Sequence, residues 1–331
     1  ACKALKARAY LWENDYSNLL SVTSELIGKY SLYTEGETPY ADLFNGNAED
    51  ADEIILAREH AHTTGSITTG NRLNQAFFLK EMSGGDALRA LTPTGSLVDA
   101  YPMADGRLIH ESGSTYDPKD PYRDRDPRLA QSIIYPTSTI RESKTMTWVL
   151  YDPESEKSIP GQRYDAKEPS SSGYVWKKYC DWSDHAMIQI LDGGVDVIYF
   201  RYADVLLMHA EALLETKGIA ASSEIFAIIN QLRDRCGGGR VTEANYTSED
   251  ALRTLVRNER RVELANEGLR FFDIRRWKVA EKTVAVSGEG MNGEVYGAFM
   301  RLDGVGATDR TVMVDGVPRR YVETYNFDPS K

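Results

Sequence analysis

The chain has 331 residues, of which 41% are hydrophobic, and its formal net charge is -11 at pH 7. A chain of this length can bury a substantial core in one large domain or two smaller ones. Its acidic balance argues against nucleic acid or an anionic membrane surface as the main partner. The three cysteines, Cys2, Cys180 and Cys236, are too few and too odd in number for a disulfide framework.

Two amphipathic stripes predict a helix pair at the start of the chain. Residues 1–13 place Leu5, Ala9 and Trp12 on one face, and residues 16–27 form a second apolar stripe that ends at Gly28. The pair resembles a tetratricopeptide unit, which cannot bury its apolar face without neighbours. We therefore expect residues 1–28 to be the C-terminal part of a set of tetratricopeptide-like repeats.

Residues 29–195 are rich in Gly, Pro, Ser, Thr and Tyr, and they predict loops with short strands at 146–151 and 174–179. His60 and His62 would suit a metal only if their loop were a strand and a carboxylate joined them, so we predict no metal and no other cofactor. Most of the 19 tyrosines lie in this region. Aromatic planes stack on the apolar face of a sugar ring, so these loops suit a glycan. The alternative is that the aromatic residues pack the loops onto the helices, and this is the role expected of Trp176.

Residues 196–283 predict a compact helical region, with helices at 201–217, 223–236, 249–267 and 270–281. Gly218, Gly237 and Gly268 follow the first three helices as termination signals. Thr247 or Ser248 is the expected N-cap of the third helix. The first helix is almost wholly apolar, so its His209 is expected to be a core residue. Residues 284–331 predict irregular structure.

A cluster of charged residues interrupts the apolar stripe of the third helix. The stripe runs through Leu252, Leu255 and Val256 and then lands on Glu259 and Glu263, so carboxylates fall where core residues are expected. Buried charges persist only when they are paired. We therefore predict a structural ion-pair cluster made of Glu259, Arg260, Glu263, Glu267, Arg270, Asp273, Arg275 and Arg276. Metal binding or acid–base chemistry is the alternative, which the absence of histidine and the interleaved arginines disfavour. The motifs HExxH, CxxC, GxxxxGK[ST] and GxSxG are absent, and we predict that the chain is not an enzyme.

The same charged segment, RNERRVELANEGLRFFDIRRW at residues 257–277, resembles the signature of the SusD/RagB family of outer-membrane lipoproteins. Further blocks resemble that family in its own order: SLVDAYPMADG at 96–106, RDRDPRL at 123–129, YVWKKY at 174–179, RYADVLLMHAEALL at 201–214 and INQLRDRCGG at 229–238. The chain departs from the pattern at Asn266, where an aromatic residue is usual, and at Cys236, where Ala is more frequent.

The resemblance implies a mainly α-helical SusD-like fold, with residues 29–331 as the C-terminal region of the family. It also implies a nutrient-binding protein on the extracellular face of the outer membrane, beside a TonB-dependent SusC-like transporter. The expected ligand is an oligosaccharide or polysaccharide. The expected site lies in residues 59–91, with Trp148 as a further candidate; the named residues are Asn71, Arg72, Asn74, Phe77, Phe78 and Trp148.

In the family the lipid-bearing cysteine precedes the helical repeats, so Cys2 is not expected to carry the anchor. We therefore expect the chain to be a fragment that lacks the lipid-anchored N-terminal region and the C-terminal tail. Two other functions stay open. The helix pair alone would permit a cytoplasmic helical-repeat scaffold that binds peptides. A glycan-cleaving enzyme would require two carboxylates that face one groove.

Overall fold

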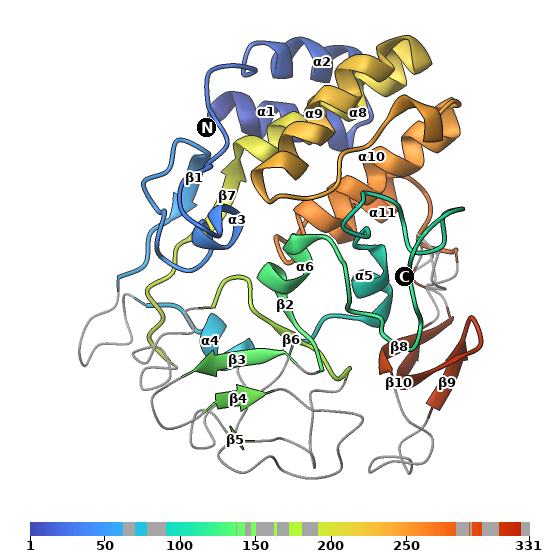
Figure 1. Cartoon of the computed structure of the whole chain (residues 1–331). Coiled ribbons are helices and arrows are strands. Elements are labelled where there is room, and N and C mark those ends of the chain that lie inside the picture. The colour runs from blue at the N-terminus through green and yellow to red at the C-terminus, as the bar shows by residue number, and fades with distance from the viewer. Residues whose placement is uncertain are drawn as a thin grey trace.

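The structure is a computed structural model that describes residues 1–61, 70–77, 91–136, 138–142, 147–149, 162–163, 172–180, 191–282, 291, 293–299 and 311–325. Helices gather at one end of the molecule, and loops with short strands occupy the other end (Figure 1). The prediction of a mainly α-helical fold with a loop-rich region is confirmed.

The central element of the helical end is α8 (Tyr202–Lys217), in which every residue from 202 to 214 is buried. Helices α1 (Cys2–Trp12), α2 (Tyr16–Ser24), α9 (Ser222–Arg235) and α10 (Glu249–Glu263) all pack against it. Their buried faces form one hydrophobic core. The face predicted for the first helix, Leu5, Ala9 and Trp12, was wrong, because α1 packs through Ala4, Ala7 and Leu11 and leaves the predicted three exposed. The buried ring of His209 lies in this core with its Nδ1 atom 2.9 Å from Thr23 Oγ1, so the prediction of a core histidine is confirmed.

Two of the three predicted glycine signals mark the end of a helix, and Gly268 is the exception because α10 ends earlier. Gly218 directly follows α8 with a φ of 59°, and Gly237 lies two residues after the end of α9 with a φ of 70°. Helix α11 (Arg270–Arg276) ends before the predicted residue 281, and Lys278 has a φ of 55°. Short 3-10 turns lie at Gly218–Ala221 and Glu243–Asn245.

Helix α10 ends at Glu263, earlier than the predicted end at residue 267. A continuing helix would bond the Glu263 carbonyl to the N–H of residue 267. Instead that carbonyl accepts hydrogen bonds from Tyr40 Oη at 2.9 Å, Arg201 Nη2 at 2.8 Å and Lys178 Nζ at 3.3 Å. Tertiary contacts therefore end this helix. Asn266 follows with a φ of 61°, a conformation that Asn adopts more readily than an aromatic residue does.

The loop-rich end has a second hydrophobic core under short elements. Its helices are α3 (Pro39–Asp42), α4 (Leu73–Phe77), α5 (Gly95–Ala100) and α6 (Pro127–Ser132). Strand β1 (Ile54–Arg58) pairs antiparallel with β7 (Val197–Arg201), and β2 (Ile133–Ile134) pairs antiparallel with β6 (Val175–Trp176). Strands β3 (Thr139–Glu142), β4 (Thr147–Val149) and β5 (Gln162–Arg163) form a three-stranded sheet. The strand predicted at 174–179 exists but is shorter, and of the strand predicted at 146–151 the structure describes residues 147–149, which are β4.

The prediction of irregular structure after residue 283 was wrong. Strands β8 (Gly293–Phe299), β9 (Thr311–Val314) and β10 (Val317–Tyr325) form an antiparallel sheet in the order β8-β10-β9. Asp315 and Gly316 join β9 to β10 with φ values of 49° and 78°. A two-residue hairpin with positive φ at both positions favours Asp-Gly, so this signal was present in the sequence.

A lattice of buried ion pairs connects the helical end to the loop-rich end. Both carboxylate oxygens of the fully buried Glu263 are used: Oε1 lies 2.8 Å from Arg201 and 2.5 Å from Arg235, and Oε2 lies 2.9 Å from Arg128. Glu259 lies 2.6 Å from the same Arg128. Burial alone would raise the pKa of Glu263, but the three guanidinium groups outweigh it and hold that pKa well below its usual value.

The lattice continues to either side of Glu263. Glu267 pairs with Arg201 at 2.6 Å and with Lys178 at 2.7 Å, and burial lowers the pKa of Lys178 to about 8 although Glu267 opposes the shift. Arg260 bridges Asp204 and Asp273, each at 2.9 Å. Arg276 contacts Asp273 and Glu211, and Glu211 also accepts a bond from Trp277 Nε1.

Two of the eight residues predicted for the cluster lie outside these ion pairs. Arg275 is exposed, with its guanidinium group 5.2 Å from the centre of the Phe271 ring. Arg270 is half-buried and lies 5.8 Å from the centre of the Trp277 ring. The main partners of Glu263 are instead arginines that are distant in the sequence.

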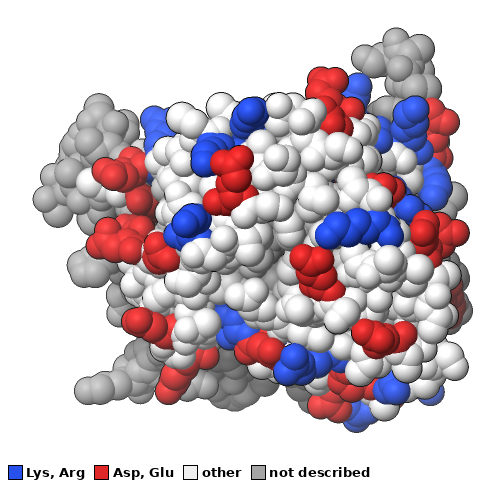
Figure 2. Space-filling view, turned by 90° about the horizontal axis from the view of Figure 1, so that it is seen from above, with Lys and Arg blue, Asp and Glu red and all other residues white. Residues whose placement is uncertain are grey.

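The helical end presents charges of both signs interspersed among uncharged residues (Figure 2). No single sign dominates this face, unlike the basic surfaces that bind nucleic acid. Among the described residues, no helix has both the length and the apolarity needed to cross a bilayer.

Of the two N-cap candidates, the structure selects Ser248. Its side chain accepts a hydrogen bond from the backbone N–H of Ala251 at 3.2 Å. We expect Ser248→Ala to lower the free energy of unfolding by about 1 kcal/mol, measured by urea denaturation, because this N–H loses its partner. Thr254→Ala, an exposed change within the same helix, is the control and should have little effect. A larger loss from Thr247→Ala than from Ser248→Ala would contradict the assignment.

Candidate functional site

The paired strands β1 and β7 hold an exposed aromatic ring beside a hollow of the surface. Successive residues of a strand point to opposite faces. Ile198 and Phe200 are buried, whereas Tyr199 between them is 48% exposed. The ladder pairs Arg58 with Val197, so the Arg58 backbone lies beside the start of β7. The ribbon therefore directs the Tyr199 side chain to its outer side.

Tyr199 lines a cavity of about 420 Å³, here called the Tyr199 groove, together with Arg58, His60, Gly70, Asn71, Arg72, Leu73 and Val197. An adjoining hollow of about 650 Å³ shares Arg58, His60 and Gly70 with the groove and adds Glu49, Asp50, Glu59, Ala61 and Asp196. The combined surface offers an aromatic ring, guanidinium groups and carboxylates. These are the groups that stack on a sugar ring and bind its hydroxyls.

Backbone hydrogen bonds hold two side chains of the adjoining hollow, which is called the acidic hollow below because Glu49, Asp50, Glu59 and Asp196 line it. Asp196 Oδ1 accepts a hydrogen bond from the His60 N–H at 2.7 Å, and the Asp196 N–H donates to Glu49 Oε1 at 2.9 Å. Burial raises the pKa of Glu49, and the bond from the Asp196 backbone acts against this rise. Within the ranges that the structure describes, no three His, Cys, Asp or Glu side chains are grouped as metal ligands. His62, the other half of the histidine pair, lies outside those ranges.

Two of the predicted glycan-binding residues line the Tyr199 groove. Arg72 is exposed there. Asn71 uses its side chain within the protein: Nδ2 donates to the Val195 carbonyl at 2.6 Å, and Oδ1 accepts from the Leu73 N–H at 3.0 Å. Asn71 therefore positions the first turn of α4, and Arg72 is the more available of the two for a ligand.

Two other predicted residues are buried and require a correction. Asn74 is 1% exposed and Phe77 is 4% exposed, and Phe77 is part of the second hydrophobic core. They are three residues apart on α4, so they share the face that the helix turns toward this core. Neither presents a surface for stacking or hydrogen bonding with a sugar. Phe78 and the side chain of Trp148, which belongs to β4, lie outside the described residues.

The sequence analysis missed Tyr199 as a site residue. Its signal was the alternation in VIYFR at residues 197–201, which places Tyr199 opposite to the two apolar residues beside it. Trp176, expected to be structural, is 7% exposed and packs in the second core.

A family model and two curated proteins that match this chain all belong to SusD-like proteins. The family model described as the SusD family matches residues 52–300. SusD-like protein P2 of Formosa agariphila is 37% identical over 102 residues, which cover 29% of this chain and 20% of that protein. SusD-like protein P38 of the same organism is 34% identical over 99 residues, which cover 28% of this chain and 18% of that protein.

Two solved structures from Bacteroides fragilis NCTC 9343 resemble nearly the whole chain. A SusD-like carbohydrate binding protein is 25% identical with a TM-score of 0.72, and the match covers 99% of this chain and 60% of that one. A SusD-like protein is 24% identical with a TM-score of 0.68, over 98% of this chain and 59% of that one. The chain thus has a SusD-like fold and spans less than two thirds of these relatives.

Proposed function

Because the chain belongs to the SusD family, we propose that it is a non-enzymatic glycan-binding protein of the cell surface. The proposal is supported by the similarity to the SusD-like carbohydrate binding protein of Bacteroides fragilis, which is 25% identical to this chain. The finer part of the proposal is that the full-length protein delivers its ligand to a TonB-dependent SusC-like transporter.

The observation that carries the proposal for this chain is the Tyr199 groove. Tyr199 is 48% exposed on a two-stranded ribbon that fixes its backbone, and a Tyr side chain has few rotatable bonds, so stacking on a sugar costs little side-chain entropy. Arg58 and Arg72 supply planar hydrogen-bond donors beside that ring. We therefore place the glycan in this groove, with Tyr199 and Arg72 as its principal contacts.

This placement predicts a loss of affinity without a loss of stability. The parent chain is first screened against soluble laminarin, xylan, mannan and galactan by affinity electrophoresis, and a retained glycan is then titrated by calorimetry. Tyr199→Ala and Arg72→Ala should each weaken binding by about five- to thirty-fold, which is about 1–2 kcal/mol. The thermal unfolding temperature should be close to that of the parent because both side chains are exposed.

Phe272→Ala is the matched control, since Phe272 is 44% exposed on α11 and does not line the groove. Its affinity should equal that of the parent. Parent-like affinity in both Tyr199→Ala and Arg72→Ala would remove the groove from consideration.

A glycan-cleaving enzyme is the second candidate, because the acidic hollow places several carboxylates beside the groove. The raised pKa of Glu49 is a property that a general acid requires. Incubation with the retained glycan and a reducing-sugar assay separates the two functions. We expect no new reducing ends, whereas a release that Glu49→Gln abolishes would establish the enzyme.

The transporter and the membrane anchor are tested on the full-length protein in its membrane. Affinity purification from detergent-solubilised outer membranes should retain a TonB-dependent transporter identified by mass spectrometry. Mass spectrometry should also locate an acyl chain on a cysteine other than Cys2. Recovery of the protein from the cytoplasm with bound peptides would favour the scaffold alternative.

A further inference from the structure

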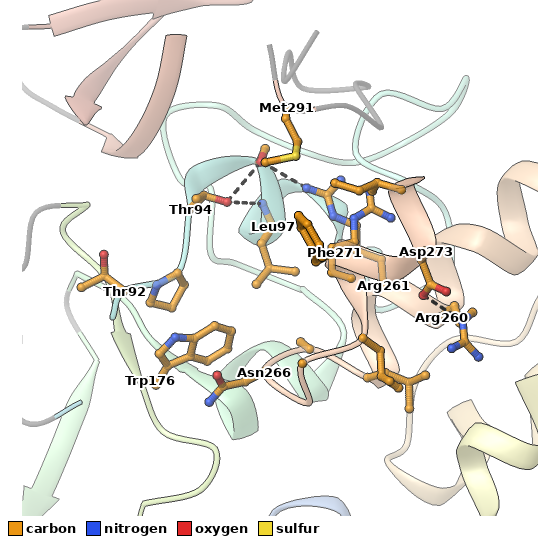
Figure 3. A pocket seen from close by; sticks show the side chains of 18 of the residues that line it. Thr92, Thr94, Leu97, Trp176, Arg260, Arg261, Asn266, Phe271, Asp273 and Met291 are labelled. Carbon is orange, nitrogen blue, oxygen red and sulfur yellow. Dashed lines mark hydrogen bonds and ion pairs between the residues drawn. The ribbon is translucent and has the colours of Figure 1, made fainter. Parts of the chain in front are cut away.

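A second cavity, of about 580 Å³, lies among α5, α10, α11, β6 and β8 (Figure 3). Its wall is mostly apolar and includes Leu97, Trp176, Leu264, Leu269, Phe271 and Ile274. In the view of Figure 3, Trp176 and Phe271 lie on opposite sides of Leu97. The described lining of this cavity shares no residue with the Tyr199 groove, so the two sites are separate.

The polar side chains of α5 in this wall already have partners. Thr94 Oγ1 accepts from the Leu97 N–H at 3.3 Å and lies 3.2 Å from Ser96 Oγ. Ser96 Oγ in turn accepts from Arg261 Nη2 at 3.1 Å. A ligand that bonded to these groups would have to replace existing bonds, which gives little net free energy.

The same holds for the polar groups near α10 and α11. Asp273 is paired with Arg260 and Arg276, each at 2.9 Å. The Asn266 amide donates to the Lys178 carbonyl at 3.4 Å. The largest gain available to a ligand therefore comes from covering the apolar wall, which scales with the apolar area removed from water.

We propose that this cavity binds an uncharged molecule, or an uncharged substituent of a larger ligand, whose faces are apolar and aromatic. A cavity of a few hundred cubic ångströms holds a small molecule of one to a few rings. Aromatic rings pack against Trp and Phe side chains in offset or edge-to-face geometry, which adds to the effect of burial. Phe271, which is part of this wall, is 49% exposed.

The probe for the test is N-phenyl-1-naphthylamine, an uncharged two-part aromatic molecule that fluoresces when it leaves water. Titration of the parent chain should give a saturable increase in fluorescence. Its analogue 1-anilinonaphthalene-8-sulfonate adds a sulfonate to the same skeleton. The uncharged probe should bind more tightly, and tighter binding of the sulfonate would overturn the assignment to uncharged ligands, because Arg261 and Arg270 would then select the ligand.

Three variants locate the probe. Leu97→Trp fills the cavity and should weaken binding by at least about ten-fold, and Phe271→Ala, which removes one wall, by about three- to ten-fold. Phe272→Ala is the matched control, because the neighbouring Phe272 is similarly exposed but stacks on Trp12, with 4.8 Å between ring centres, outside the cavity. It should bind the probe as the parent does.

Thermal unfolding checks that each variant is folded. If Leu97→Trp does not fold, the comparison of Phe271→Ala with Phe272→Ala decides. The proposal is overturned by the absence of saturable binding in the parent, by parent-like binding in Phe271→Ala, or by an equal loss in the two phenylalanine variants. These outcomes do not depend on whether the chain binds a glycan.

Discussion

Replacing Glu263 with alanine is expected to lower the free energy of unfolding by about 3–5 kcal/mol. The side chain is fully buried and is the common partner of Arg128, Arg201 and Arg235. Its removal leaves three guanidinium groups in a place that water does not reach, with fewer carboxylates to balance them. The cost comes from these unbalanced charges more than from the lost contacts themselves. Urea denaturation of the purified variant measures the change.

Glu25→Ala is the matched control for this effect. Glu25 also forms an ion pair, with Lys3 at 2.6 Å, but its side chain is 54% exposed. Solvent screens such a pair, and its loss should cost far less than the loss of Glu263. If Glu263→Ala unfolds like the parent but no longer binds a ligand or a metal, the cluster is functional and the structural interpretation is wrong.

The free energy of unfolding is expected to fall steeply as the pH decreases below about 4.5. Among the residues that the structure describes, five buried carboxyl groups have lowered pKa values in the folded chain, namely Asp126, Asp204, Glu211, Glu263 and Glu267. Burial alone would raise these pKa values, but guanidinium groups close to each carboxylate outweigh it. Such a group stabilises the fold above its unfolded pKa, which is 4.5 for Glu and 3.8 for Asp. That stabilisation is lost as the pH falls through the lower folded pKa.

A single carboxyl group of this kind can contribute about 2–3 kcal/mol, so the combined loss between pH 6 and pH 3 should exceed about 3 kcal/mol. Glu49 acts in the opposite direction, because its pKa is raised, but within the described part of the chain it is one such group against five. Urea denaturation across this pH range measures the slope. Glu263→Gln should make the slope shallower, since one of the titrating groups is gone. A stability that stays constant down to pH 3 would contradict the ion-pair lattice.

For the charged cluster, burial and pairing could be predicted from the sequence, but the partners could not. Carboxylates at positions of a helix stripe where core residues belong predicted that Glu259 and Glu263 are buried and paired, because a buried charge requires a partner. The identity of the partners did not follow. Arg128, Arg201 and Arg235 come from α6, the end of β7 and the end of α9, and only the packing of these elements brings them to one carboxylate.

For the proposed glycan site, the sequence likewise indicated the region but not which of its side chains are exposed. The sequence indicated the stretch around residue 71, where Arg72 lines the Tyr199 groove, but it did not separate exposed from buried residues on the single turn of α4. Phe77 points into the core because α4 packs on the second hydrophobic cluster. Tyr199 reaches the groove because β7 pairs with β1, and its sequence separation from Arg72 hides that proximity.

By itself the sequence determined most of the long helices and the burial of the charged stripe, and its motif blocks in family order established the SusD/RagB resemblance that implies the mainly helical fold. The helices and the buried charges follow from local periodicity, from glycine termination signals and from the cost of an unpaired charge, all of which act within a short stretch of chain. Only the tertiary structure decided where α10 ends, which arginines balance Glu263, and which side chains line the two cavities. The reason is physical: these features depend on contacts between residues that are far apart in the sequence. The Glu263 carbonyl is an example: it accepts hydrogen bonds from Tyr40, Arg201 and Lys178 in place of a bond within its own helix. These tertiary contacts end α10 earlier than the local sequence pattern predicts.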